Sequence, residues 1–267
     1  MKVAINGFGR IGRAVLRICV EKGVNVTAIN NPGTVDDMVY LLKYDSVYGP
    51  YKHEIVQGKD FIKVRGKKIH VYHELDPEKL PWKKHGIDVV VESTGLFRDR
   101  EGASKHIAAG AKKVLISAPG KEPDATIVMG VNHNDLKSKH KIVSCASCTT
   151  NCLAPIIKCI NDSLGVENAY MTTVHAYTTS QVLLDIHNEK DRRRGRGGAI
   201  NLIPTTSGAA TAVAKVIPEL KGKISGMAIR APIPVGSLVD LTVVVPKNTS
   251  AEKVNAAIKR LAQTRLK

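Results

Sequence analysis

The feature that most constrains the fold is a glycine-rich motif, Gly7-Phe8-Gly9-Arg10-Ile11-Gly12, that directly follows a short apolar run. The apolar run has the composition of a buried strand, and residues 11–22 have the periodicity of a helix. Between a strand and a helix, such a motif is a dinucleotide-binding fingerprint: the first Gly makes a tight turn, the second lets a pyrophosphate approach, and the third allows close packing. We therefore expect dinucleotide binding at this turn.

The first half of the chain continues to alternate apolar strands with helical patterns. Thr34 is placed to cap a helix that carries Asp36 and Asp37 in its first turn. This alternation is typical of βαβ units and predicts a doubly wound, parallel Rossmann sheet. The expected strands are 2–6, 24–30, 87–92, 113–117, 126–129 and 141–144, with shorter strands within 55–72, and the expected helices are 11–22, 34–43 and 101–109.

The pattern changes near residues 145–150, where we place a domain boundary. Thr249 and Glu252 form a plausible capping box for a last helix. The 176–200 segment exceeds the roughly 12–15 residues usual for an unstructured loop, which makes it a candidate functional loop. The expected helices of this half are 148–162, 206–216 and 251–262, and the expected strands are 169–175, 224–230 and 237–245.

Charge and cysteine content limit the partners and the compartment. The 267 residues include 40 Lys and Arg against 24 Asp and Glu, a net charge of +16, which favours nucleic acid, a membrane surface or phosphorylated metabolites as partners. Aromatic residues make up only 4%, few for the stacking surfaces of single-strand binders. The sequence has neither a run long enough for a membrane helix nor a signal peptide, and its 5 cysteines lack disulfide spacing. We expect a cytoplasmic protein.

Asn31 stands at the end of the second expected strand, where a dinucleotide fingerprint normally has an acid for the ribose hydroxyls. A neutral amide binds the diol less strongly than a carboxylate and does not repel a 2′-phosphate. Either NAD or NADP is therefore compatible with this position.

Cys148 is expected at the start of a helix, in the segment Ser144-Cys145-Ala146-Ser147-Cys148-Thr149-Thr150-Asn151-Cys152. The dipole and the free N–H groups of a helix N-terminus favour the thiolate form of a cysteine. His175 ends an expected strand and leads into the long loop, so one helix and one returning strand would bring the two side chains together. A metal site is not expected, because there is no second cysteine pair at zinc spacing.

Several longer motifs carry a resemblance to a known family. In order, they are INGFGRIGR, LLKYDSVYG, VVESTG, ASCTTNCLAP, TTVHAYT, IPTTSGAA and GMAIR. The chain resembles phosphorylating glyceraldehyde-3-phosphate dehydrogenase from end to end, and ASCTTN is the most discriminating motif. The resemblance implies a homotetramer whose subunit has an NAD(P)-binding Rossmann domain, residues 1–147, and an α+β catalytic domain with a mostly antiparallel sheet, residues 148–267.

The resemblance also implies roles for individual residues. Cys148 is the nucleophile that forms a thiohemiacetal and then a thioester, and His175 activates it; the Cys148 N–H and the His175 ring stabilise the oxyanion. The implied sites for the substrate phosphate and for inorganic phosphate comprise Ser147, Thr149, Thr178, Arg194, Ser207, Gly208 and Arg230. The implied cofactor site comprises Gly7, Gly9, Arg10, Ile11, Gly12, Asn31, Ser93, Thr94, Gly95 and Ser117.

The sequence departs from the family pattern in places that matter. Asn31 replaces an Asp that selects NAD, and Ile186-His187 replaces a Leu-Pro pair that faces the neighbouring subunit's cofactor. Family members that use NADP change both places, which predicts dual or NADP use. Ser207 replaces a Thr but keeps the hydroxyl. The segment before Arg194 also differs, which weakens the assignment of that arginine.

Alternative functions remain open at this point. Family members continue for several dozen residues beyond Lys267, so the sequence is expected to be partial or truncated, and a truncated chain would be an inactive fragment. Erythrose-4-phosphate dehydrogenases share the same motifs. A basic nucleic-acid-binding protein would show affinity that falls steeply with salt and is indifferent to Cys148. Oxidation of glyceraldehyde 3-phosphate to 1,3-bisphosphoglycerate, in glycolysis or gluconeogenesis, is the reaction that the motifs favour.

Overall fold

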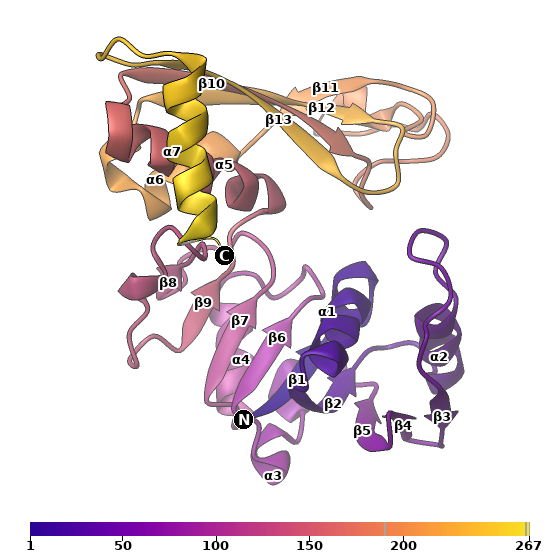
Figure 1. The fold of residues 1–267 in the computed structure, drawn as a ribbon. Helices are drawn as coiled ribbons and strands as arrows, with labels where there is room; N and C mark the ends of the chain where they lie inside the picture. Colours follow the sequence, from indigo (N-terminus) through magenta and orange to yellow (C-terminus); the bar gives the residue numbers. More distant parts are fainter. Residues whose placement is uncertain (190, 265, 267) are drawn as a thin grey trace. The chain divides into compact units, whose positions relative to one another are not determined.

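A computed structural model describes residues 1–189, 191–264 and 266. The chain forms two compact units, one of residues 1–126 with 135–146 and the other of residues 127–134 with 147–267 (Figure 1). Within the described residues, no helix is long and apolar enough to cross a membrane.

The first unit is built on a nine-stranded sheet with the order β3-β4-β5-β2-β1-β6-β7-β9-β8. All neighbours from β5 to β8 in this order run parallel, and the β3-β4-β5 edge is antiparallel. The order reverses beside β1, because the chain leaves β1 toward β2 and later returns to its other side with β6. The strands are β1 Lys2–Asn6, β2 Asn25–Asn30, β3 Ile55–Gln57, β4 Phe61–Val64, β5 Lys67–Tyr72, β6 Val89–Glu92, β7 Lys113–Ile116, β8 Ala125–Thr126 and β9 Ile142–Ser144.

Helices cover both faces of this sheet, and the alternation along β1 shows why. Val3 and Ile5 pack with the α1 and α2 side chains Leu16 and Leu42, whereas Ala4, between them, packs on the other face with Trp82. Residues of opposite parity on a strand point to opposite faces, so an all-apolar strand needs a cover on each side. The helices are α1 Arg10–Glu21, α2 Val35–Lys43, α3 Trp82–His85 and α4 Arg100–Ala108.

The second unit is a four-stranded sheet, in the order β11-β12-β10-β13, with helices on one face. β10 runs parallel to β12, and the other two pairings are antiparallel. The strands are β10 Asn168–Ala176, β11 Ile203–Thr206, β12 Ile224–Ala231 and β13 Ser237–Val244, and the helices are α5 Cys148–Leu164, α6 Ala209–Val216 and α7 Ala251–Gln263. Figure 1 shows this sheet as a long twisted ribbon with the three helices gathered at one end.

Alternation along β10 separates the two faces of this sheet. Met171 and Thr173 are buried on the face that α5 and α6 cover, whereas Tyr170 is exposed on the other face. His175 has the parity of Met171 and Thr173, and the register pairs it with Arg230 on β12 and Ser237 on β13. The strand thus brings His175 to the helix-bearing face at its carboxyl end.

The fold class predicted from the sequence is confirmed, and three local predictions are wrong. The strand predicted at 126–129 is only the two-residue β8, Ala125–Thr126. The helix predicted from residue 206 begins at Ala209, because Thr206 still belongs to β11. The last helix is capped by Ser250, whose hydroxyl accepts the N–H of Lys253, and not by Thr249.

Candidate active site

The glycine motif forms a turn in which two of its glycines have no room for a side chain. Gly7 has a φ of +90°, and a Cβ there would lie 2.6 Å from the backbone N of Thr94. A Cβ on Gly12 would lie 2.0 Å from the carbonyl oxygen of Gly7. Gly9 differs, because a Cβ there would meet nothing within 4 Å. Only at Gly9, therefore, does the missing side chain leave open space next to the backbone.

The N-terminus of α1 begins at this open position. Gly9 is the N-cap residue. Among the described residues, no side chain forms a capping hydrogen bond to the helix, and the first turn contains no acid. A helix end with free N–H groups and a positive dipole suits a pyrophosphate, so the residues present fit a dinucleotide. Arg10, in the same turn, forms an ion pair with Asp45. Burial raises the pKa of Asp45, but the N–H groups of Tyr48 and Val47 and the Arg10 guanidinium lower it more, to about 2.

The other predicted cofactor residues follow the neighbouring strands at the same sheet edge. Ser93, Thr94 and Gly95 come directly after β6, and Ser117 comes directly after β7. The Ser117 hydroxyl donates to the carbonyl of Glu92 at 2.9 Å and lies 3.3 Å from the Ser93 hydroxyl. The ends of β1 and β6 lie where the strand order reverses, which is the usual ligand site of an open α/β sheet.

Asn31 follows β2 at this edge, and its side chain has a defined orientation. Its Oδ1 accepts the N–H of Phe8 at 3.0 Å, so the carbonyl side of the amide faces the glycine turn. Within the described residues, no hydrogen bond engages its Nδ2. The Asn31 Nδ2 group therefore remains available as an N–H donor.

A buried polar network below this edge was not predicted from the sequence. Glu92, fully buried, accepts hydrogen bonds from the N–H and the hydroxyl of Thr94 and from Asn6 Nδ2, the last at 2.6 Å. It also contacts His106 at 3.1 Å, and His106 in turn accepts from the indole of Trp82. The network fixes the loop that carries Thr94. A carboxylate at the end of an otherwise apolar strand was the signal in the sequence.

Cys148 is the first residue of α5, as predicted, and its sulfur is in contact with His175. The Sγ atom lies 3.1 Å from His175 Nε2. Ser147 caps the helix, since its hydroxyl oxygen accepts the N–H of Thr150 at 3.0 Å. Ala146, just before the cap, has a φ of 58°, which is strained for a residue with a Cβ. The turn thus presents an exposed thiol to an imidazole at a helix N-terminus.

His175 Nδ1 has two neighbours that favour different tautomers. It lies 2.7 Å from the carbonyl oxygen of Ala176 and 2.7 Å from a guanidinium nitrogen of Arg230. If Nδ1 donates to Ala176, Nε2 is free to accept a proton from the Cys148 thiol. If Nδ1 accepts from Arg230, Nε2 carries the proton and donates to the sulfur. Arg230 also donates to the Ala176 carbonyl at 3.1 Å, so it has a partner in either case.

A cationic cluster lies next to this pair. Burial lowers the pKa of Arg230, the charge of Arg194 lowers it further, and Cys148 raises it, which puts the three groups within electrostatic reach. Arg194 donates to the Thr205 hydroxyl at 2.8 Å, and that hydroxyl donates to Asp191 at 3.3 Å. Asp191, an acid that directly precedes three arginines, was not singled out in the sequence. It lines a hollow of about 330 Å³ with Arg193, Arg194 and Thr206.

The remaining predicted phosphate residues lie in several local settings. The Thr178 hydroxyl is exposed and bonds to Ser180 and Gln181 at 2.9 and 3.1 Å. Thr149 is buried, with its hydroxyl 3.9 Å from the Cys148 sulfur. Ser207 accepts the N–H of Ala209 at 3.2 Å, and Gly208 is the N-cap of α6, with open space where a Cβ would be.

Together, the first unit has the fold of a dinucleotide-binding domain, and the second holds a thiol and an imidazole in contact beside arginines. These features define the class: a dinucleotide-dependent protein with a nucleophilic cysteine. Residues 1–100 match the sequence family described as glyceraldehyde 3-phosphate dehydrogenase, NAD binding domain, and residues 147–267 match its C-terminal domain. The chain belongs to the glyceraldehyde-3-phosphate dehydrogenase family.

Curated relatives from bacteria are similar over nearly the whole chain. Glyceraldehyde-3-phosphate dehydrogenase 2 of Bacillus subtilis is 49% identical over 266 residues, which are 99% of this chain and 78% of the relative. The enzyme of Clostridium pasteurianum is 51% identical over 98% of this chain and 79% of its own length. That of Geobacillus stearothermophilus is 51% identical over 100% of this chain and 80% of its own length.

Proposed function

We propose that this protein oxidises glyceraldehyde 3-phosphate and couples the oxidation to the uptake of inorganic phosphate, forming 1,3-bisphosphoglycerate. The observation that carries the proposal is the 3.1 Å contact between Cys148 Sγ and His175 Nε2 at the start of α5. The names of the relatives support the same reaction. Because the reaction needs Cys148 as a free thiol, a reducing compartment, the cytoplasm, suits it.

In the first half of the reaction, the Cys148 sulfur adds to the aldehyde carbon while His175 Nε2 takes the thiol proton. The resulting oxyanion lies at a helix N-terminus, where the Cys148 N–H and the protonated His175 donate to it. The hydride that leaves this carbon needs the nicotinamide ring as its acceptor, which is the chemistry that the cofactor supplies when bound. Loss of the hydride converts the adduct into a thioester on Cys148.

In the second half, a phosphate oxygen attacks the thioester carbonyl, and the Cys148 thiolate leaves. Two anions must be held near one sulfur, the phosphate group of the substrate and the attacking phosphate. Arg230 and Thr178 are proposed for the first, and Arg194, Ser147, Thr149, Ser207 and Gly208 for the second. Burial lowers the pKa of Arg230, and the positive charge of Arg194 lowers it further. An anion that binds near both arginines relieves their mutual repulsion.

Substrate binding and base activation are linked through Arg230 in this proposal. While Arg230 donates to His175 Nδ1, Nε2 must carry the proton and cannot act as a base. A substrate phosphate that draws the guanidinium away leaves the Ala176 carbonyl, at 2.7 Å, as the partner of Nδ1. Nε2 then becomes the acceptor that the thiol needs.

We further propose that the protein accepts NADP as well as NAD. The Asn31 amide turns its Oδ1 toward Phe8 and leaves Nδ2 as a donor, which suits a 2′-phosphate better than a carboxylate would. His187, which is exposed, is a second difference from the family pattern, at a place that also differs in family members that use NADP. The cofactor itself would be held by Gly7, Gly9, Arg10, Ile11, Gly12, Asn31, Ser93, Thr94, Gly95 and Ser117.

A homotetramer is proposed from the uncovered sheet face of the second unit. Tyr170, Leu238 and Val244 share that face and are 47%, 60% and 51% exposed. In the long loop, Leu183 and Leu184 are each 80% exposed. Apolar surface of this extent marks protein contacts, and copies of the same chain are the partner that the family implies. Sedimentation velocity at micromolar concentration is expected to give a tetramer.

The test of the proposed function measures initial rates with glyceraldehyde 3-phosphate, phosphate and either NAD or NADP. Cys148→Ser is expected to lower the rate by at least about a thousandfold, since an alcohol is a far weaker nucleophile at neutral pH. Cys152→Ser, which changes an exposed thiol one turn further along α5, is the matched control and is expected to keep near-normal rates. Faster turnover of erythrose 4-phosphate, or a Cys148→Ser enzyme that remains active, would contradict the proposal.

A further inference from the structure

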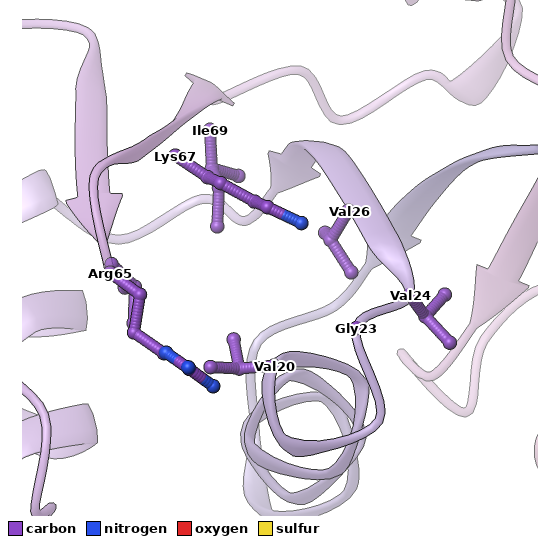
Figure 2. A pocket seen from close by; sticks show the side chains of 8 residues that line it. Val20, Gly23, Val24, Val26, Arg65, Lys67 and Ile69 are labelled. Atoms are coloured by element: carbon purple, nitrogen blue, oxygen red, sulfur yellow. The ribbon is translucent and has the colours of Figure 1, made fainter.

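A pocket that the proposed reaction does not use lies in the first unit, away from the carboxyl edge of its sheet. It is formed where the end of α1, the start of β2 and the β4–β5 hairpin meet, and its volume is about 220 Å³ (Figure 2). β2 starts beside this pocket and ends beside Asn31, so the two sites lie at opposite ends of the strand. The lining residues are Val20, Gly23, Val24, Val26, Val64, Arg65, Lys67 and Ile69.

Most of the wall of the pocket is apolar. Val26, Val64 and Ile69 belong to the main core of the unit and are 4%, 1% and 2% exposed. Val20 and Val24, half-buried, complete the wall on the helix side. The last carbonyls of α1 do not add open acceptors, because Ile18 and Val20 accept from Lys22 and Gly23, at 2.9 and 3.4 Å. A ligand in this pocket therefore meets hydrocarbon on most sides.

Among the described residues that line the pocket, the charged groups are two cations, Arg65 and Lys67. In Figure 2 the Arg65 and Lys67 side chains extend across it, with their nitrogen atoms near Val20 and Val26. Neither side chain forms an ion pair within the described residues. Lys68, the next residue, takes the opposite face of the strand and lies over the Phe61 ring, 4.3 Å from its centroid. Both cations of the pocket thus remain available to an anion.

The backbone at Arg65 is strained for an arginine. Arg65 and Gly66 form the two-residue turn between β4 and β5, with φ values of 49° and 76°. A hairpin turn with two positive φ angles favours Asn, Asp or Gly at the first position. The local backbone does not account for arginine here, whereas a role for its side chain at the pocket does.

We propose that this pocket binds a small amphipathic anion, namely a carboxylate on a short aliphatic chain. The aliphatic tail of the ligand lies among the valines and Ile69, and its carboxylate lies between the Arg65 guanidinium and the Lys67 ammonium. Apolar burial supplies the attraction for the chain, and the two cations select for the negative charge. The site is independent of the proposed dehydrogenase reaction, since no group of that reaction lines it.

The test uses hexanoate as the probe and hexanol as its neutral counterpart, with the affinity of each measured by ligand-observed NMR titration of the full chain. The wild-type protein is expected to bind hexanoate about tenfold more tightly than hexanol. The double variant Arg65→Gly with Lys67→Gln is expected to bind hexanoate about tenfold more weakly and hexanol with unchanged affinity. Glycine suits the turn, so this variant keeps its fold.

Lys68→Gln is the matched control for Lys67→Gln, because it removes one positive charge from the same strand on the other face. It is expected to leave both affinities unchanged, while Val20→Asn, which puts an amide in the apolar wall, weakens both ligands. Equal affinities of the wild type for hexanoate and hexanol would overturn the proposal. So would a loss in Lys68→Gln as large as in the double variant, since that would reflect general attraction to a basic surface.

Discussion

The N-termini of α1 and α5 solve the same electrostatic problem in opposite ways. Both ends carry free N–H groups and a positive dipole. At α1, the N-cap is Gly9, and no side chain among the described residues forms a capping hydrogen bond. The glycines of the turn have no side chains that would cover the helix end. At α5, Ser147 caps the helix with its own hydroxyl, and the next residue is the exposed Cys148.

The difference follows from what each end must hold. A large external anion needs bare backbone and open space, so the end at α1 is left uncapped and built from glycine. A nucleophile that belongs to the chain needs a fixed backbone, so the end at α5 is capped and its thiol is set against His175. The site at α1 depends on the absence of side chains, whereas the site at α5 depends on contacts between its own side chains.

His175→Asn tests the second half of this comparison and has the largest expected effect. Loss of the base is expected to lower the rate of NADH formation by about a thousandfold. The helix end remains, so Cys148 should still react with iodoacetamide, more slowly than in the wild type. Stopped-flow rates and alkylation rates measure the two effects. Loss of alkylation together with the fold, seen by circular dichroism, would mean that His175 is structural.

Gly9 and Gly12 differ in the space that an added methyl group would find. Gly12→Ala places a Cβ against the Gly7 carbonyl and is expected to lower the free energy of unfolding by about 3 kcal/mol. Gly9→Ala has open space and is expected to change it by no more than about 1 kcal/mol, while weakening NAD binding at least about tenfold. Urea denaturation and a fluorescence titration with NADH measure the two quantities. If the two variants lost the same free energy of unfolding, the proposed difference between Gly9 and Gly12 would be wrong.

Asp45→Asn tests the ion pair at the start of α1. The pKa of Asp45 is lowered to about 2 in the folded protein, below its usual value of 3.8, so the ionised carboxylate stabilises the fold. That stabilisation is complete above pH 4 and is lost as the pH falls from about 4 toward 2. The variant is expected to be about 2 kcal/mol less stable at pH 7, with a smaller difference at pH 3. Urea denaturation at several pH values measures this, and a difference independent of pH would rule out the carboxylate as its source.

Local patterns allowed much of the fold and of the site to be predicted. The glycine motif, the position of Cys148 at a helix start and the position of His175 at a strand end depend on neighbours a few residues away. Asp45, Asp191 and the Glu92–His106 contact were missed because their partners are brought close only by the fold. A carboxylate in sequence does not reveal which guanidinium it will meet.

The errors in secondary structure have a similar origin. The sequence pattern predicts a helix from Thr206, but Thr206 belongs to β11, where it pairs with Met227. Ser250 and Thr249 are both good caps, and the sequence contains no rule to choose between them. The pairing of Thr206 with Met227, in contrast, joins residues that are distant in the sequence, so a local pattern does not reveal it.

Ser147→Ala removes the cap at α5 and has the smallest expected effect. The Thr150 N–H loses its acceptor, so the free energy of unfolding is expected to fall by about 1 kcal/mol. Ser147→Thr keeps a hydroxyl and is the control, expected to remain within about 0.5 kcal/mol of the wild type. If the cap also fixes the thiol, the alkylation rate of Cys148 will change in the alanine variant and not in the threonine variant. A stability loss with an unchanged alkylation rate would mean that the helix end needs its cap for folding alone, and the contrast with α1 would then be one of stability and not of chemistry.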